Sequence, residues 1–240
     1  MGDTKLVFKR YEKKYLLSRE QYETLFRELR DHIVPDAYHR STVCSIYYDT
    51  DDYELIRRSI EAPVYKEKLR LRSYGVPDDD GTVFIELKKK YKGMVYKRRV
   101  PMGAKAAMDY LAGKAGPTEN SQMTREIDWF LHENDVKPKA FIACDRYAWV
   151  DKENPELRIT FDENLRWRTD RLDLTLGAEG ESLTEPGAVL MEIKIPGTAP
   201  LWLARLLSDQ RVFPTSFSKY GTCYKNHILS EYFNGVIKSV

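Results

Sequence analysis

Charged and apolar side chains alternate along residues 65–74, and this alternation restricts the fold more than any other feature of the chain. The basic residues stand two apart, at Lys66, Lys68, Arg70 and Arg72. Successive side chains of a β-strand point to opposite faces, so the four cations would share one face of one strand. A single cationic strand face usually lies in water, so its meaning depends on whether other strands repeat the pattern.

Three further segments, 82–90, 157–163 and 189–195, repeat this alternation. Their charged positions are Glu86, Lys88, Lys90, Arg158, Asp162, Glu192 and Lys194, and the residues between them are mostly apolar. A sheet that carries a charged face on strand after strand, opposite a firmly apolar face, predicts a charged interior. Such an interior is suited to holding an anion.

The overall charge hides a predicted separation of charge. The 240 residues contain 39 Lys and Arg and 37 Asp and Glu, a formal net charge of +2, which by itself does not indicate a nucleic-acid-binding protein. The cations assigned to inward faces or to the site are Arg10, Lys14, Lys66, Lys68, Arg70, Arg72, Lys88, Lys90, Arg146, Arg158, Lys194 and Lys219. The anions assigned there are Glu12, Glu86, Asp162 and Glu192. This excess of cations favours a focused site for an anionic ligand.

Helices with an apolar stripe are expected to cover the apolar faces of these strands. Strands are predicted at 7–17, 42–49, 64–74, 82–90, 94–101, 139–151, 157–163, 165–170 and 189–195. Helices are predicted from Ser18, as the N-cap, toward Pro35, and at 53–60, 104–111, 121–134, 200–208 and 222–233. The predicted fold class is α+β. Residues 1–240 would form a single domain, a closed antiparallel eight-stranded β-barrel tunnel with a charged interior and helices packed outside.

Composition also bears on the compartment. No apolar stretch reaches the length of a membrane span, and the first residues lack the apolar core of a signal peptide. Cys44, Cys144 and Cys223 are widely spaced, which indicates small buried residues of a reducing compartment rather than disulfides or a metal site. We therefore expect a cytoplasmic protein, recruited to a membrane only through a partner.

Six segments resemble a known family when they are taken in order. They are KLRLRSYG (68–75), FIELKKK (84–90), CDRYAW (144–149), LRITFDENL (157–165), AVLMEIKI (188–195) and FSKY (217–220). Each segment alone is a weak signal, but together they are similar to the VTC domain. This is the polyphosphate-polymerase branch of the CYTH-like triphosphate tunnel metalloenzyme superfamily. The resemblance extends over nearly the whole chain.

The resemblance implies a set of site residues. Catalytic contacts to phosphate would come from Arg70, Arg72, Lys88, Arg146, Arg158 and Lys219, and further ligand contacts from Lys14, Lys68 and Lys194. A Mn²⁺ or Mg²⁺ ion would be held by Glu192, with Glu12 and Glu86. From the residues alone, Glu86 has a second interpretation, an ion pair with Lys88 or an arginine, and Asp162 has one with Arg158 or Arg146. Arg10 stands where many tunnel enzymes carry an acidic ligand, which weakens the case for two tightly bound metals.

The implied function is metal-dependent transfer of a phosphoryl group from ATP to a growing inorganic polyphosphate chain. Two alternatives stay open: hydrolysis of a triphosphate or polyphosphate, and a non-catalytic polyphosphate-binding module. The sequence has no GxxxxGK[ST] loop, so the phosphates would be held by strand side chains. The expected partners are ATP, inorganic polyphosphate and a membrane protein, with no nucleic acid; the oligomeric state is left open.

Overall fold

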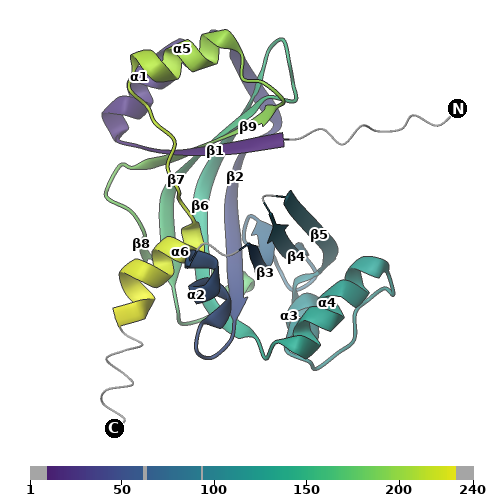
Figure 1. Ribbon diagram of the computed structural model, residues 1–240. Coiled ribbons are helices and arrows are strands. Elements are labelled where there is room, and N and C mark those ends of the chain that lie inside the picture. The colour runs from purple at the N-terminus through teal and green to yellow at the C-terminus, as the bar shows by residue number, and fades with distance from the viewer. Residues whose placement is uncertain (1–9, 62–63, 93, 231–240) are drawn as a thin grey trace, which may run out of the picture. The chain divides into compact units, whose positions relative to one another are not determined.

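The structure is a computed structural model that describes residues 10–61, 64–92 and 94–230 (Figure 1). The chain divides into two compact units. The first unit comprises residues 1–41, 145–164 and 184–217, and the second comprises residues 42–144, 165–183 and 218–240. The expectation of a single domain stays a prediction.

The strands form an open sheet, so the predicted closed barrel is wrong. The nine-stranded sheet has the order β1-β9-β7-β6-β2-β3-β4-β5, with the short strand β8 paired to β7. β1 and β5 are the two ends of this path. Alternating charge shows which side chains share a face, but it carries no information on whether the first and last strands pair. Closure depends on strand tilt and stagger, and these are properties of the hydrogen-bonded ladder.

In the first unit, β1 (Arg10–Leu17) pairs with β9 (Val189–Pro196), and β9 pairs with β7 (Arg158–Arg168), both antiparallel. Helices α1 (Arg19–Leu29) and α5 (Leu201–Asp209) lie on the apolar face of these strands (Figure 1). The core they share includes Leu17, Leu25, Phe161, Met191 and Leu203, all nearly inaccessible to solvent. The helices therefore cover the apolar strand face, as the sequence predicted.

Helix α1 begins where the sequence places it. The Ser18 hydroxyl accepts a hydrogen bond from the Gln21 backbone N–H (3.1 Å), and the Gln21 side chain accepts one from the Ser18 N–H (3.0 Å). This reciprocal cap satisfies two backbone donors that the first helical turn leaves open. The predicted extension toward Pro35 is wrong, because the helix ends at Leu29 and Ile33 starts β2 (Ile33–Asp49). Ile33 is buried as the first residue of β2, so its apolar character reflects the start of a strand and not a further helical turn.

In the second unit, β2, β3 (Tyr65–Tyr74), β4 (Thr82–Tyr91) and β5 (Met94–Gly103) pair antiparallel in that order. Helices α3 (Ala104–Leu111) and α4 (Gln122–Glu133) cover their apolar face (Figure 1). The core includes Leu69, Leu71, Ile85, Leu87 and Phe130, each at most 1% exposed. The opposite face of the same strands is left for the charged side chains.

The remaining elements complete the two units. They are α2 (Glu54–Ile60), β6 (Lys137–Asp151), the 3₁₀ turn η1 (Leu174–Leu176), β8 (Glu181–Ser182), α6 (Lys219–Cys223) and the π-helical turn η2 (Tyr224–Ile228). The strands predicted at 157–163 and 165–170 are one strand, β7. Asn164 lets it continue by adopting a left-handed backbone (φ 49°), a conformation that Asn tolerates better than most residues. The predicted starts before residue 10 and end after residue 230 lie outside the described residues.

Candidate functional site

The second unit gathers basic side chains on one face of β3, β4 and β5. The strand register places Arg70 opposite Glu86, and Glu86 opposite Arg99. We call this surface the cationic face; its residues are Lys66, Lys68, Arg70, Arg72, Glu86, Lys88, Lys90, Lys97 and Arg99. Glu86 is its one acidic member, so the cationic face has a large excess of positive charge.

Glu86 is the centre of the cationic face and is 1% exposed. Its Oε2 lies 2.8 Å from Arg70 Nε and 2.6 Å from Arg70 Nη2. Its Oε1 lies 2.7 Å from Arg99 Nε and 2.7 Å from Lys97 Nζ, and Arg72 Nη1 is 4.0 Å from Oε2. Burial alone would raise the pKa of Glu86, but the charges of Arg70 and Arg72 and the Lys97 hydrogen bond hold that pKa well below its usual range. Glu86 is therefore ionised and holds several cations in place.

Arg70 is also held from the β2 side. Its Nη1 donates to the Tyr47 hydroxyl (3.3 Å), and the Tyr47 ring stacks on Tyr220 with 4.8 Å between centroids. The Tyr220 hydroxyl in turn donates to Asp49 (3.0 Å), which accepts the backbone N–H groups of Leu55 and Ile56. Burial would raise the pKa of Tyr47, but Arg70 and Arg72 lower it on balance. These contacts fix the direction of Arg70 before any ligand binds.

The side chain of Lys68 on β3 reaches the start of α6, where Lys219 also stands. Lys68 Nζ donates to the Ser218 hydroxyl (2.9 Å), which also caps the helix by accepting from the Gly221 N–H. Lys219 is the first residue of α6, and its charge contributes to the lowered pKa of Tyr47. The FSK segment therefore brings Ser218 and Lys219 to the β3 side of the cationic face. Arg72 is buried and donates from Nε to the Ser45 hydroxyl (3.2 Å).

Lys88 is exposed and lies opposite Lys68 on β3 and Lys97 on β5. It forms no ion pair within the residues that the structure describes. Three lysines at neighbouring ladder positions repel one another in water only modestly, but each gains from a shared anion. Lys68, Lys88 and Lys97 thus extend the cationic face along the strands beyond Glu86.

Lys97 and Arg99 belong to the site but were not predicted from the sequence. Both lie on β5 and contact Glu86 directly, at 2.7 Å and 2.6 Å. The signal was present, because Lys97 and Arg99 alternate with Arg98 and Val100 in the same period of two. Arg98 points to the opposite face, where it forms two hydrogen bonds with Glu126 of α4 (2.8 and 3.0 Å). Because Lys97, Arg98 and Arg99 are consecutive and all basic, the sequence alone does not show that Lys97 and Arg99 share the cationic face.

The first unit places its charged residues in mutual ion pairs. Lys14 Nζ lies 3.3 Å from Glu192 and 3.8 Å from Glu12, and it donates to the Phe217 carbonyl (3.2 Å). Arg146 forms a two-pronged pair with Asp162 (2.6 and 2.7 Å) and lies 3.7 Å from Glu192. Asp162, for which the sequence allowed Arg158 or Arg146 as a partner, contacts Arg146 of β6.

Arg158 and Lys194 stand opposite each other on β7 and β9. Arg158 Nε lies 2.8 Å from Asp36 Oδ2. Burial lowers the pKa of Lys194, while the nearby carboxylates of Glu12 and Glu192 raise it in part. Each of these two cations therefore already has acidic neighbours within the first unit.

The three acidic residues expected to hold a metal differ in their surroundings. Glu86 is enclosed by cations, which does not fit a metal ligand. Glu12 and Glu192 both approach Lys14 Nζ, so their carboxylates lie near each other and fit a divalent cation better. Among the described residues, no three His, Cys, Asp or Glu side chains form a group that could hold a metal ion. The metal therefore stays a prediction.

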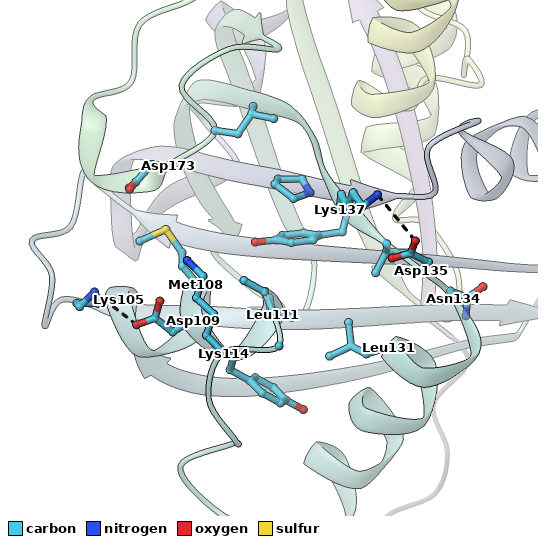
Figure 2. Close-up of a pocket in the computed structure, with 17 residues that line it drawn as sticks. Lys105, Met108, Asp109, Leu111, Lys114, Leu131, Asn134, Asp135, Lys137 and Asp173 are labelled. Carbon is cyan, nitrogen blue, oxygen red and sulfur yellow. Dashed lines mark ion pairs between the residues drawn. The ribbon is translucent and has the colours of Figure 1, made fainter.

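A cavity of about 640 Å³ opens on the helix side of the second unit (Figure 2). Met108 and Leu111 of α3 and Leu131 of α4 contribute apolar side chains to its lining. Ion pairs stand at its rim, between Lys105 and Asp109 (3.4 Å) and between Lys137 and Asp135 (3.8 Å). None of the residues predicted for the site lines this cavity, and its charges are balanced. It is thus distinct from the cationic face.

Comparisons with known proteins support the fold and identify the family. A solved structure of a putative adenylate cyclase from Bacillus halodurans has a TM-score of 0.54 and 15% identity, and it covers 86% of this chain and 92% of its own. This likeness concerns the fold alone. No described helix has both the length and the hydrophobicity needed to cross a membrane.

A sequence relative is the vacuolar transporter chaperone complex subunit 4 of Trypanosoma brucei brucei (strain 927/4 GUTat10.1), 26% identical over 155 residues. The match covers 52% of this chain and 20% of the relative, so the matched half of the chain corresponds to about a fifth of that protein. The family model of the VTC domain matches residues 9–228, nearly the full length. The chain therefore belongs to the VTC domain family.

Proposed function

We propose that this VTC domain binds the phosphates of ATP and of inorganic polyphosphate and transfers a phosphoryl group from the first to the second. One observation carries the proposal: Glu86 is a lone buried carboxylate among Arg70, Arg72, Lys97 and Arg99. A cluster with several cations and one anion is stabilised by a polyanion. The name of the trypanosome relative agrees with a role in a vacuolar complex.

The chemistry needs little more than positioning and charge. Phosphoryl transfer is accelerated mainly by holding the reacting oxygens in line and by stabilising the charge on the transferred group. Arginine offers two parallel N–H donors to phosphate oxygens, and lysine acts as a mobile point charge. Arg70 and Arg72 would grip the phosphates. Lys88 and Lys68 would bind further phosphates along the polyphosphate chain, and Lys219 would add positive charge from α6.

We assign the predicted metal to Glu192 and Glu12, and we assign Glu86 to positioning Arg70 and Arg99. A bound Mg²⁺ or Mn²⁺ would supply charge stabilisation for phosphoryl transfer. Lys14, which contacts both Glu12 and Glu192, would have to exchange its ion pairs when the metal binds. Glu192→Ala should abolish turnover and leave metal-free polyphosphate binding largely intact; turnover that survives this change would refute the metal role.

The direct test is incubation of the purified chain with ATP and Mn²⁺, followed by electrophoretic separation of long polyphosphate and assay of free phosphate. Arg70→Ala should lower product formation by at least tenfold, since a charged hydrogen bond contributes about 1.5–3 kcal/mol. Arg98→Ala is the matched control. Arg98 is a neighbouring arginine on the opposite face that pairs with Glu126, and its removal should leave turnover unchanged.

The same assay decides among the three candidate activities. Long polyphosphate indicates a polymerase, and free phosphate without polymer indicates a hydrolase. If neither product forms while polyphosphate still raises the melting temperature, the domain is a binding module and the transfer proposal fails. The expected cytoplasmic location and membrane-protein partner stay predictions.

A further inference from the structure

The end of the β4–β5 hairpin exposes a concentration of large apolar side chains. Of the 17 described large hydrophobic residues that are exposed, six belong to this end. We call it the hairpin tip; these six residues are Val64 (61% exposed), Tyr65 (37%), Tyr91 (43%), Met94 (57%), Val95 (51%) and Tyr96 (47%). None of them belongs to the core beneath α3 and α4. Scattered exposed apolar residues are normal, but a contiguous group marks an interaction site.

The tip presents apolar groups on both faces of the hairpin. The register aligns Tyr65, Tyr91 and Met94, and it places Val95 opposite Lys90 on the other face. The rings of Tyr65 and Tyr91 contact each other edge to face, with 6.5 Å between centroids. Because both faces carry apolar groups, one flat protein surface could bury only part of them. A fluid medium that surrounds the tip could bury them all.

Lysines flank these apolar groups along β4 and directly after it. Residues 87–108 contain eight basic residues and no acidic residue. At the tip, Lys92 Nζ lies 5.3 Å from the centre of the Tyr91 ring, and Lys90 is exposed. Lys89 pairs with Glu67 of β3 (3.2 Å). Long lysine side chains can bury their carbon stems while the ammonium groups stay in water.

We propose that the hairpin tip inserts into the interfacial layer of an anionic lipid membrane. Aromatic rings and a methionine flanked by lysines match this layer, where apolar side chains reach the acyl boundary and lysines meet anionic headgroups. A second copy of the chain is a poorer occupant, since joining two tips would bring their lysines together. This inference does not rest on the proposed phosphoryl transfer.

The first test is flotation of the chain with phosphatidylcholine vesicles that contain or lack phosphatidylserine. We expect binding only to the anionic vesicles. Met94→Ser combined with Tyr96→Ser should weaken it by about tenfold or more, because each change removes exposed apolar area. Lys92→Gln should weaken it about fivefold. The matched control is Leu201→Ser, which removes an apolar residue of similar exposure (63%) in α5 of the first unit and should leave binding unchanged.

A second arm separates the tip from the cationic face, which could also attract anionic headgroups. Arg70→Ala, which weakens the cationic face without touching the tip, should leave vesicle binding largely intact if the tip carries it. Binding that is lost in Arg70→Ala and kept in the serine variants would overturn the proposal.

Insertion itself has a spectroscopic signature. Met94→Trp should shift its fluorescence to shorter wavelength on anionic vesicles and be quenched by brominated lipids, relative to the parent chain with its four tryptophans. Leu201→Trp should show neither change. Absence of vesicle binding, with the fold intact by circular dichroism, would reject a membrane in favour of a protein partner.

Discussion

Both units carry charged side chains on one face of antiparallel strands, but the two faces balance their charges differently. In the first unit, Lys14, Arg146, Arg158 and Lys194 stand among Glu12, Asp36, Asp162 and Glu192. In the second unit, eight basic residues share a strand face with the one carboxylate of Glu86. Equal alternation in the sequence thus leads to a balanced face in one unit and a cationic face in the other.

The difference separates two physical roles. Charges that pair within the protein already have the partners they need, so an incoming anion must compete with those partners. Cations that outnumber their partners raise the energy of the folded state, and a bound polyanion lowers it again. We therefore expect phosphate binding to depend mainly on the second unit. In the first unit we expect a divalent cation to compete for the carboxylates that now form ion pairs.

The largest expected effect comes from removing the single anion of the cationic face. Glu86→Gln should lower the free energy of unfolding by about 3 kcal/mol, because it leaves Arg70, Arg99 and Lys97 without their shared carboxylate. Asp162→Asn should cost less, since Arg146 keeps Glu192 at 3.7 Å. Amide hydrogen exchange of β3 and β4 reports on the second unit, and exchange of β1 and β9 reports on the first.

Added tripolyphosphate sharpens this prediction. It should restore more stability to Glu86→Gln than it adds to the parent chain, since it supplies the missing negative charge. Equal losses in the two variants, without rescue by the polyanion, would show that the two faces do not differ as proposed.

The second effect concerns affinity. Without divalent metal, Arg70→Ala should weaken tripolyphosphate binding by about tenfold or more, whereas Arg158→Ala should change it by less than about threefold. Arg158 serves as the comparison because it pairs with Asp36 and is partly exposed, so its removal leaves no deeply buried charge. Isothermal titration calorimetry gives both constants, and a larger loss for Arg158→Ala would place phosphate binding on the first unit.

The sequence alone allowed us to predict which charged side chains share a strand face, but not which residues they pair with. Alternation around Arg70 placed its neighbours on the correct face, and Ser18 marked the start of α1, because both signals are local. The contacts of Glu86 with Arg99 and Lys97 depend on strand register between β4 and β5, which alternation does not fix. Ile33 was misassigned because its apolar spacing fits either a helix end or a strand start. The prediction of a closed barrel was wrong because the sequence of β1 or of β5 alone does not show whether the two strands pair.

The smallest effect is a dependence on pH that should occur in one unit only. Burial lowers the pKa of Lys97, although its hydrogen bond to Glu86 raises it in part, and burial likewise lowers the pKa of Lys194. A lysine holds phosphate only while it is protonated, so affinity is present below this lowered pKa and is lost as pH rises through it. Without divalent metal, the affinity for tripolyphosphate should therefore begin to fall at a lower pH than it would if the lysine had its ordinary pKa. The affinity should fall by about threefold in total, because one partly exposed charge is lost.

Lys97→Arg should remove part of this alkaline loss, since arginine stays charged, and Lys66, whose pKa burial also lowers, should account for a further part. Lys194→Arg is the matched change in the first unit and should leave the profile as it is, because its charge is balanced by Glu12 and Glu192. Calorimetric titrations at neutral and alkaline pH on the three chains measure this directly. A profile flattened by Lys194→Arg and untouched by Lys97→Arg would assign the phosphate to the balanced face instead.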